Sequence, residues 1–490
     1  MDVRRADTTK TYAYDKLILA QGARPSPLPI AGSDLPRVFT LYTIDDLKAI
    51  RSVIHSRGCS NATVIGAGFI GLEAAENLVQ LGLKVSLLEY TQHVFPPADQ
   101  EIASLVETEL RRNGVDVYTG QDVLEITDTA TDGDTEAPLR IRTRNDLSLE
   151  ADLIIIAAGV RPVTSLAAAA GLKIGSRGVS VDRFMQTSDP DIYAVGDMVE
   201  TEHRILARPT TVALAGLANR QGRLAANSIF GQPVPWRGNV AVSVCQVFER
   251  TVAVVGPSVR ALRLLGRAVD WVTVHTPNHA GYYPGARPMT LRLAFDPETG
   301  RILGAQAAGM EGVDKRIDVL STCIQAEMNV FDLEHLELAY APPYGSAKDP
   351  INMAGFVASN VMRGEVRILH ACDLGNVEAS WQIVDVRSEA EYSRGHLRGA
   401  VNLPVDSIRG LLPKLDRSRP VLVYCHVGYR GYLAYRILVQ AGFDVKNLDG
   451  GFATVIEGGH QSFTTLDHIC CDCKPSLTGK PRLKATATQT

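Results

Sequence analysis

Apolar runs bounded by Gly and Pro alternate with amphipathic stretches along most of the chain, a pattern typical of α/β proteins. Residues 12–20 first alternate and then run apolar, which predicts a strand that Gly22 and Pro25 end. Residues 43–54 have helical spacing and place Thr43 at the N-cap position. A strand, an extended connector and a helix are therefore predicted at the start of the chain.

The next segments predict a β-α-β unit and two further elements. The strand NATVIGAG (61–68), a helix from about Ile70 and the strand KVSLLE (84–89) follow one another. Residues 99–114 place their apolar side chains on one stripe and end in Asn-Gly, which predicts a helix with a C-cap. Residues 151–159 are almost wholly apolar, as expected of a buried parallel strand.

The second half of the chain changes pattern twice. Residues 206–230 predict one long helix that ends at Gly231, and a mixed strand and helix pattern then continues to about residue 365. Near residue 370 an α/β pattern begins again. The elements predicted in the mixed region are strands near 240–255, 270–275 and 290–308 and helices near 315–327 and 351–362.

Composition limits the class of protein. The 490 residues suffice for three or four domains, and 45% hydrophobic with 21% charged residues is typical of a soluble globular chain. A net charge of -4 gives no reason to expect a nucleic-acid partner, and apolar runs such as LIIIAAGV (153–160) are too short for a membrane span. Eight scattered cysteines do not form a disulfide framework, which favours a cytoplasmic location.

A glycine-rich loop follows the strand at 61–68. Gly66 allows a tight turn, Gly68 lets the backbone approach a pyrophosphate, and Gly71 lets helix and strand pack closely. Glu89 ends the second strand 23 residues after Gly66, where a carboxylate accepts hydrogen bonds from a ribose 2′-OH and repels a 2′-phosphate. The loop therefore predicts a dinucleotide site that prefers NADH, with NADPH as the second candidate.

Two other segments predict ligand or catalytic chemistry. The buried strand in TSDPDIYAVGDMVE (187–200) ends in Gly196-Asp197, where a carboxylate can bind a ligand hydroxyl. A second apolar strand ends in Cys425, followed by a six-residue loop to Arg430 and a helix. Converging N–H groups and the helix N-terminus favour a thiolate at Cys425, and Arg430 adds positive charge for an anionic sulfur donor. The alternative for Cys425 is an inert buried cysteine.

Two other patterns suggest metal binding without supporting it. His275 and His279 have H-x3-H spacing, but no further ligands accompany them, so a metal site is rejected. The CCDC segment at 470–473 lies in a polar C-terminal stretch predicted to be disordered. Incidental thiols are the favoured interpretation of this cluster, and a thiol that collects sulfur from Cys425 is the alternative.

The glycine loop GAGFIGLE, the segment AAGVRPVT (157–164) and TSDPDIYAVGDMVE together resemble the pyridine nucleotide-disulfide oxidoreductases. The resemblance implies that FAD and NADH are cofactors. It implies that Phe69 gates the nicotinamide pocket with Glu73 nearby, that the segment containing Gly159 connects the two cofactors, and that Asp197 holds the flavin ribityl chain. The N-terminus of the helix near 206 would point toward the flavin.

The segment YDKLILAQGARP (14–25) resembles the end of the first half of that family's FAD-binding domain. A first FAD glycine loop and a redox cysteine are expected before it, yet the first cysteine is Cys59. The hypothesis drawn from the sequence is an N-terminally truncated chain or a start codon assigned too late.

The sequences HAGYYPGA (279–286) and the segment 338–360 resemble the coenzyme A-disulfide reductase and NADH oxidase branch. This implies a homodimer in which Tyr344, and less surely Tyr340, reach the partner's active site and donate a proton to a leaving thiolate. The alternative is that these tyrosines only pack in a Pro-rich loop.

The last α/β region resembles a single rhodanese domain. IVDVRSEAEYSRGHLRGAVNLP (383–404), the Cys425 loop and NLDGGF (447–452) match its motifs in order, with Asp385, Arg387 and His396 at the matching positions. Gly431 replaces the common Ser or Thr, and the final Trp of the usual ending is absent. Cys425 is thereby implied to carry a persulfide.

The sequence predicts doubly wound α/β nucleotide-binding domains, an α+β dimerisation domain and a C-terminal α/β rhodanese domain. The predicted function is an FAD- and NAD(P)H-dependent reductase of coenzyme A-disulfide, persulfide or polysulfide, coupled to rhodanese sulfur transfer. On the hypothesis of an N-terminal truncation, the reductase activity would be lost. The alternatives are an NADH oxidase or peroxidase, and a sulfurtransferase on a flavin-free dimeric scaffold. The predicted divisions are a remnant FAD region and linker (1–58), NAD domain (59–160), second FAD segment (161–237), dimerisation domain (238–366), rhodanese domain (367–465) and tail (466–490).

Overall fold

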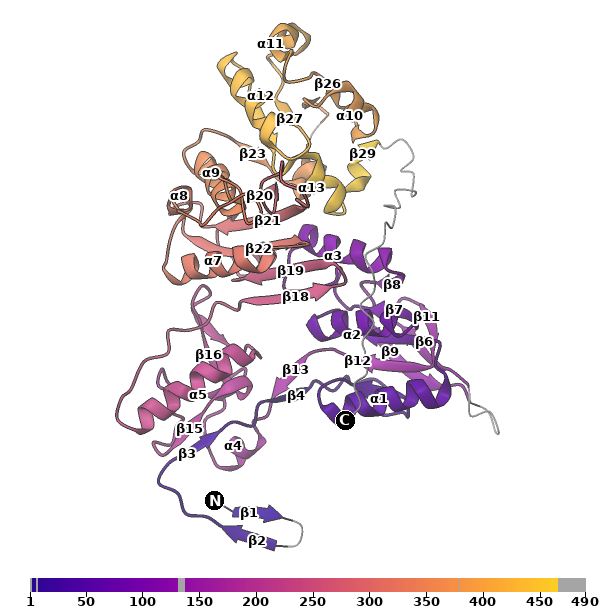
Figure 1. The fold of residues 1–490 in the computed structure, drawn as a ribbon, viewed down its shortest axis with the longest axis vertical. Coiled ribbons are helices and arrows are strands. Elements are labelled where there is room, and N and C mark those ends of the chain that lie inside the picture. Colours follow the sequence, from indigo (N-terminus) through magenta and orange to yellow (C-terminus); the bar gives the residue numbers. More distant parts are fainter. Residues whose placement is uncertain (1, 6–7, 131–136, 378, 466–490) are drawn as a thin grey trace.

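The computed structural model describes residues 2–5, 8–130, 137–377 and 379–465 of the chain (Figure 1). The predicted tail over 466–490, including the CCDC cluster, lies outside the described residues. Within the described part of the chain, no helix has both the length and the apolar character that crossing a lipid bilayer requires.

A five-stranded parallel sheet forms the centre of the first nucleotide-binding unit. Its elements are β5 (Val38–Thr40), α1 (Ile44–Arg57), β6 (Asn61–Ile65), α2 (Phe69–Gln80), β7 (Lys84–Leu88), α3 (Gln100–Arg112), β8 (Val115–Tyr118) and β12 (Leu153–Ile156). The strand order is β5-β12-β6-β7-β8, and every neighbouring pair is parallel. The helix predicted over 99–114 is confirmed as α3, and Thr43 is confirmed as the N-cap of α1, where it forms a capping box with Asp46. An antiparallel meander of β9 (Val123–Asp128), β10 (Leu139–Thr143) and β11 (Ser148–Ala151) follows β8.

Segments from both sides of this unit form a second, smaller one. It contains β3 (Leu17–Leu19), β4 (Ala23–Pro25), β13 (Val160–Pro162), α4 (Ser165–Ala169), β14 (Val179–Ser180), β15 (Ile192–Ala194), the 3-10 turn η1 (Gly196–Met198), β16 (Val199–His203), β17 (Arg208–Thr210) and α5 (Ala215–Ile229). β3 pairs with β15 in parallel, and β4 pairs with β13 antiparallel. A hairpin of β1 (Asp2–Arg5) and β2 (Thr8–Thr11) precedes β3.

The single helix predicted over residues 206–230 is wrong at its start. Residues 208–210 form β17, which pairs antiparallel with β16, and α5 begins only at Ala215. Pro209 explains the difference, because a proline disfavours helical backbone at the residue before it and offers no N–H of its own.

An antiparallel sheet lies at the middle of the molecule (Figure 1). Its region contains β18 (Ser243–Val247), β19 (Arg250–Val255), α6 (Val259–Leu264), β20 (Asp270–Pro277), β21 (Pro288–Phe295), β22 (Ile302–Gly309), α7 (Val313–Gln325), α8 (Val330–Glu334) and α9 (Pro350–Met362). The strand order β18-β19-β22-β21-β20 leaves β20 at one edge. Sequence periodicity missed α6 and α8, because six and five residues are too few to show a helical period.

The C-terminal region, drawn in yellow and orange in Figure 1, is built around a separate parallel sheet. It contains β23 (Ile368–Leu369), β24 (Gln382–Asp385), α10 (Glu389–Ser393), β25 (His396–Leu397), β26 (Val401–Asn402), α11 (Ile408–Leu411), β27 (Val421–Tyr424), α12 (Tyr429–Gln440), β28 (Val445–Leu448), α13 (Gly451–Glu457) and β29 (Thr464–Thr465). The strand order is β23-β28-β27-β24-β26, with all pairs parallel.

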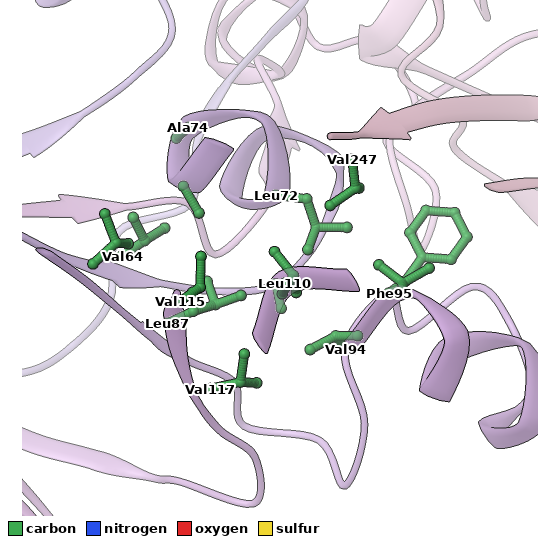
Figure 2. Packing of buried hydrophobic residues seen from close by; sticks show 14 of the residues in the cluster. Val64, Leu72, Ala74, Leu87, Val94, Phe95, Leu110, Val115, Val117 and Val247 are labelled. Atoms are coloured by element: carbon green, nitrogen blue, oxygen red, sulfur yellow. The ribbon is translucent and has the colours of Figure 1, made fainter. Parts of the chain in front are cut away.

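One buried cluster joins the first unit to the antiparallel sheet. Figure 2 shows Val64, Leu87 and Val115 beneath α2, with Val247 of β18 close to Leu72. All five are fully buried or nearly so. The two units therefore share a hydrophobic core, which fixes the position of α2 and its N-terminal loop relative to the antiparallel sheet.

Candidate functional site

The glycine loop between β6 and α2 has the geometry that its sequence predicts. Gly66 has φ +105°, and a Cβ there would lie 2.5 Å from the carbonyl oxygen of Ala157. A Cβ on Gly71 would lie 1.8 Å from the carbonyl oxygen of Gly66, so helix and loop touch directly at this position. A Cβ on Gly68, the N-cap of α2, would meet nothing within 4 Å. Gly66 and Gly71 are thus required by the fold, whereas Gly68 leaves open space for a ligand.

A cleft of about 830 Å³ opens in front of this loop. Its lining includes Gly66 and Gly68 at the N-terminus of α2, Gly159 after β12, and Leu214, the N-cap of α5. Two long helices therefore direct the positive ends of their dipoles at one cleft. This arrangement suits a ligand that carries phosphates, as a dinucleotide does.

Glu89 lines the cleft and is only 6% exposed. One carboxylate oxygen accepts the N–H of Ala67 at 2.7 Å, and the other accepts both the N–H and the hydroxyl of Thr91 at 2.8 and 2.9 Å. A carboxylate has about four acceptor positions, so three are used and one is available. Glu89 thus closes the loop around Ala67 and can still accept one ribose hydroxyl.

Phe69 and Glu73, one helical turn apart on α2, are placed differently. Phe69 lines the cleft and packs edge-on against Phe95, with ring centroids 5.0 Å apart. Glu73 is exposed and is not among the described residues that line the cleft. The predicted position of Phe69 beside a ligand therefore fits the cleft, and the role of Glu73 stays a prediction.

Gly196 and Asp197 form η1 directly after β15. Gly196 has φ +81°, and its N–H donates to the side-chain oxygen of Gln221 in α5 at 2.7 Å. Asp197 is half-buried, and this burial raises the pKa of its carboxyl group. The turn is held against α5, but Asp197 is not among the described residues that line the cleft.

Cys425 begins a tight loop between β27 and α12. Its side chain is 1% exposed, and the loop turns back at Gly428, which has φ +95°. The helix α12 starts at Tyr429, so its N-terminus lies at the loop. The predicted order of buried strand, cysteine, loop and helix N-terminus is present, but the loop is shorter than predicted, because Arg430 already lies in the first turn of α12.

Arg430, predicted to add positive charge beside Cys425, is paired with a carboxylate that the sequence did not indicate. It forms two hydrogen bonds with the carboxylate of Glu391 in α10, at 2.8 and 2.7 Å. Bonding to Glu391 raises the pKa of Arg430, and Cys425 adds to this effect. Arg430 is therefore paired with a carboxylate, and its charge toward a donor anion is partly compensated.

Glu391 was missed by sequence reasoning. The hydrogen bond from Arg430 lowers the pKa of Glu391 to about 2. Because this folded value lies below the usual 4.5, the pair stabilises the fold above about pH 4.5 and loses that contribution as the pH falls toward 2. The available signal was the capping box of α10, in which Ser388 and Glu391 bond reciprocally.

The remaining rhodanese-type positions have structural contacts. Asp385 is fully buried and accepts from the Arg387 guanidinium at 3.0 and 2.6 Å, and Arg387 also donates to the carbonyl oxygen of Gly395. His396 stacks on Tyr392 with ring centroids 3.9 Å apart. These contacts hold the start and end of α10, which carries Glu391.

The unusual Gly431 is explained by a neighbouring strand. A Cβ at Gly431 would lie 2.3 Å from the side-chain oxygen of Asn447, whose amide donates to the carbonyl oxygen of Gly428 at 3.2 Å. A side chain at position 431 must therefore displace Asn447 and its contact with the loop.

We expect Gly431→Ser to lower the free energy of unfolding by about 1–3 kcal/mol, because it overpacks a buried contact. Thermal unfolding of the full chain measures this loss. The matched variant Gly431→Ser with Asn447→Ala should recover most of it, since the colliding oxygen is removed. A single variant as stable as the parent chain would contradict the packing argument.

Tyr340 and Tyr344 lie in the loop before α9 and are 51% and 73% exposed. Tyr344 is not among the described residues that line the cleft. Tyr344 is therefore exposed to solvent or to a partner and does not face a site of its own chain.

The two histidines that were rejected as metal ligands make other contacts. His275 hydrogen-bonds with Thr290 and Thr454, and His279 hydrogen-bonds with Asn278.

Three family models match successive parts of the chain. The pyridine nucleotide-disulphide oxidoreductase model matches residues 2–222, its dimerisation domain matches 242–349, and the rhodanese-like domain matches 373–457. A coenzyme A disulfide reductase of Staphylococcus haemolyticus is 32% identical over 351 residues, which are 71% of this chain and 76% of that protein. The chain belongs to the pyridine nucleotide-disulphide oxidoreductase family.

Solved structures extend the comparison of this oxidoreductase through the C-terminal region. The reduced Bacillus anthracis CoADR-RHD has a TM-score of 0.88 and 38% identity, and the match covers 93% of this chain and 81% of that one. A NAD-dependent persulfide reductase from A. fulgidus has a TM-score of 0.85 and 36% identity, covering 92% and 82% of the two chains. The predicted family and fold class are thereby confirmed, and the dimerisation-domain match supports the predicted homodimer.

Proposed function

We propose that the chain is an NADH-dependent flavoprotein that reduces a small disulfide, persulfide or polysulfide, and that Cys425 transfers sulfane sulfur. The observation that carries the proposal is the presence in one chain of a dinucleotide cleft and a buried cysteine loop of the rhodanese type. Reduction of a sulfur–sulfur bond and transfer of sulfane sulfur are successive operations on one class of substrate, which gives a chemical reason for the fusion.

The cleft residues fit NADH. Gly66 and Gly68 at the N-terminus of α2 would hold the pyrophosphate, and the remaining acceptor position of Glu89 would take a ribose hydroxyl. A 2′-phosphate next to this buried carboxylate would be repelled, so NADPH is the weaker candidate. Phe69 would then lie beside the nicotinamide.

The fit to FAD is partial. Gly196, Asp197 and the N-terminus of α5 suit the ribityl and flavin end of the cofactor. The described residues before β3 form only the β1-β2 hairpin, so the ADP end finds no glycine-rich turn among them. FAD, when bound, supplies a two-electron carrier between the nicotinamide and sulfur.

At Cys425 the chemistry is a displacement at sulfur. The Cys425 thiolate attacks the outer sulfur of a donor such as thiosulfate, a bond forms between the two sulfurs, and sulfite leaves with the electron pair of the broken bond. The loop N–H groups and Arg430 would stabilise the resulting persulfide anion. A thiolate acceptor then removes the outer sulfur and restores Cys425.

The expected partners follow from the same proposal. Tyr344, exposed in the loop before α9, would reach the active site of the second subunit in a homodimer and donate a proton to a leaving thiolate. A cytoplasmic location fits the five described cysteines, all of which are free thiols.

Assays with the purified full chain, run without oxygen and then with oxygen or peroxide added, test this function. We expect flavin absorbance near ~450 nm, NADH oxidation that depends on polysulfide or a small disulfide, and sulfur transfer from thiosulfate to cyanide. NADH oxidation that requires oxygen or peroxide instead would indicate the oxidase or peroxidase alternative. Sulfur transfer without flavin and without NADH oxidation would indicate a sulfurtransferase on a dimeric scaffold.

A further inference from the structure

The carbonyl groups of the Cys425 loop are held by α13. The N–H groups of Phe452 and Ala453 donate to the carbonyl oxygens of Cys425 and His426, each at 2.8 Å. Gly451, at φ +65°, approaches so closely that a Cβ would lie 2.6 Å from the Cys425 oxygen. In a trans peptide the C=O and the following N–H point in opposite directions. The position of α13 therefore sets the direction of the N–H groups of His426 and Val427.

The dimerisation domain fixes the position of the turn that precedes α13. Asp449 is 4% exposed, and one of its carboxylate oxygens accepts the N–H of Thr273 at 2.9 Å. Thr273 lies on β20, the edge strand of the antiparallel sheet, so this outward N–H has no neighbouring strand to bond. A buried N–H needs a partner, and Asp449 is the residue that supplies it.

The other carboxylate oxygen of Asp449 also contacts residues outside α13. It lies 3.4 Å from Nδ1 of His370, whose Nε2 lies 3.0 Å from the carboxylate of Asp270. The ring of His370 stacks on Trp271 of β20, with centroids 3.5 Å apart. One oxygen of Asp449 is therefore held directly by β20, and the other contacts His370 of the C-terminal region, which itself packs on β20. Asp449 transmits this position to Gly450, Gly451 and the Cys425 loop.

We propose that Asp449 is a positioning residue through which the dimerisation domain orients the Cys425 loop for sulfur transfer. The inference rests on the proposed function of Cys425. Asp449 touches neither the sulfur nor the donor and acts through α13. The sulfur-transfer site is then complete only when the rhodanese domain is docked on β20, which links this site to the oxidoreductase part of the chain.

Three substitutions of Asp449 in the full chain separate the effect of side-chain length from the effect of side-chain charge. Asp449→Ala removes the acceptor, Asp449→Asn keeps an oxygen at the same distance, and Asp449→Glu keeps the charge but adds a methylene that displaces α13 from β20. The matched control is His460→Gln, which alters another interdomain contact without touching the loop: Nε2 of His460 lies 3.5 Å from a carboxylate oxygen of Glu101. Circular dichroism confirms that each variant is folded.

The first readout is the kcat and KM of sulfur transfer from thiosulfate to cyanide. The second is the rate at which iodoacetamide alkylates Cys425 as a function of pH, measured by peptide mass spectrometry. Misplacing a reacting group by about 1 Å can lower the reaction rate ~100-fold. We therefore expect Asp449→Ala to lower both kcat and the alkylation rate of Cys425 roughly tenfold. Asp449→Glu should lose about fivefold, whereas Asp449→Asn and His460→Gln should stay within about twofold of the parent.

Folded Asp449→Ala with unchanged kcat and alkylation would overturn the inference, as would an equal loss in His460→Gln. If Asp449→Ala does not fold, equal activity of Asp449→Asn and Asp449→Glu overturns it instead. Cys425→Ser separates the two proposals. If sulfur transfer survives in Cys425→Ser, the proposed function is refuted. If the rate depends on Cys425 but does not change when Asp449 is substituted, only the positioning role is refuted.

Discussion

Replacing Cys425 with serine is expected to abolish sulfur transfer, with a loss of at least about a thousandfold in the rate of thiosulfate-to-cyanide turnover. The serine hydroxyl stays protonated at neutral pH and cannot hold a sulfane sulfur as a persulfide. The buried position of Cys425 beside the N-terminus of α12 leaves room for a nearly isosteric oxygen, so the fold should persist. The rate and the thermal unfolding midpoint of the full chain measure both parts of this expectation.

Cys372 provides the matched control, because it is exposed and lies in a 3-10 turn of the same C-terminal region, between β23 and β24. Although the residue as a whole is exposed, desolvation of its thiol, with the nearby Asp373 carboxylate, raises the pKa of Cys372 to about 11, so it is a neutral thiol at physiological pH. We expect Cys372→Ser to transfer sulfur at the parent rate. Loss of activity in this variant together with activity in Cys425→Ser would assign the nucleophile to Cys372.

The second large effect is expected at the glycine loop, where two similar substitutions should have opposite consequences. Gly71→Ala should lower the free energy of unfolding by about 1–3 kcal/mol, because its Cβ would lie 1.8 Å from a backbone oxygen that cannot move easily. Gly68→Ala should leave stability within about 0.5 kcal/mol of the parent, because its Cβ meets nothing within 4 Å.

Binding of NADH distinguishes the roles of the same two glycines. A methyl group at position 68 would occupy the space through which a pyrophosphate approaches the backbone, so the Kd for NADH should rise about tenfold in a folded protein. Thermal unfolding and NADH fluorescence titration of Gly68→Ala test this. A folded Gly68→Ala chain that binds NADH as tightly as the parent would show that the cofactor does not use this loop.

Much of the site could be predicted because it depends on short-range patterns. The strand, loop and helix around Gly66, the helix over 99–114 and the loop after Cys425 are each encoded within about 20 consecutive residues by apolar period, turn glycines and caps. Where such a pattern was ambiguous, as before α5, a single proline decided against the predicted helix.

The sequence by itself determined the order of the domains, the dinucleotide loop and the position of Cys425 between a buried strand and a helix. Tertiary structure alone decided that Arg430 pairs with Glu391, 39 positions away, and that Asp449 accepts the N–H of Thr273, 176 positions away. It also placed Asn447 against Gly431. The physical reason is that backbone period and turn preference are local properties, whereas a charge or a buried N–H finds its partner only once segments distant in the sequence have packed together.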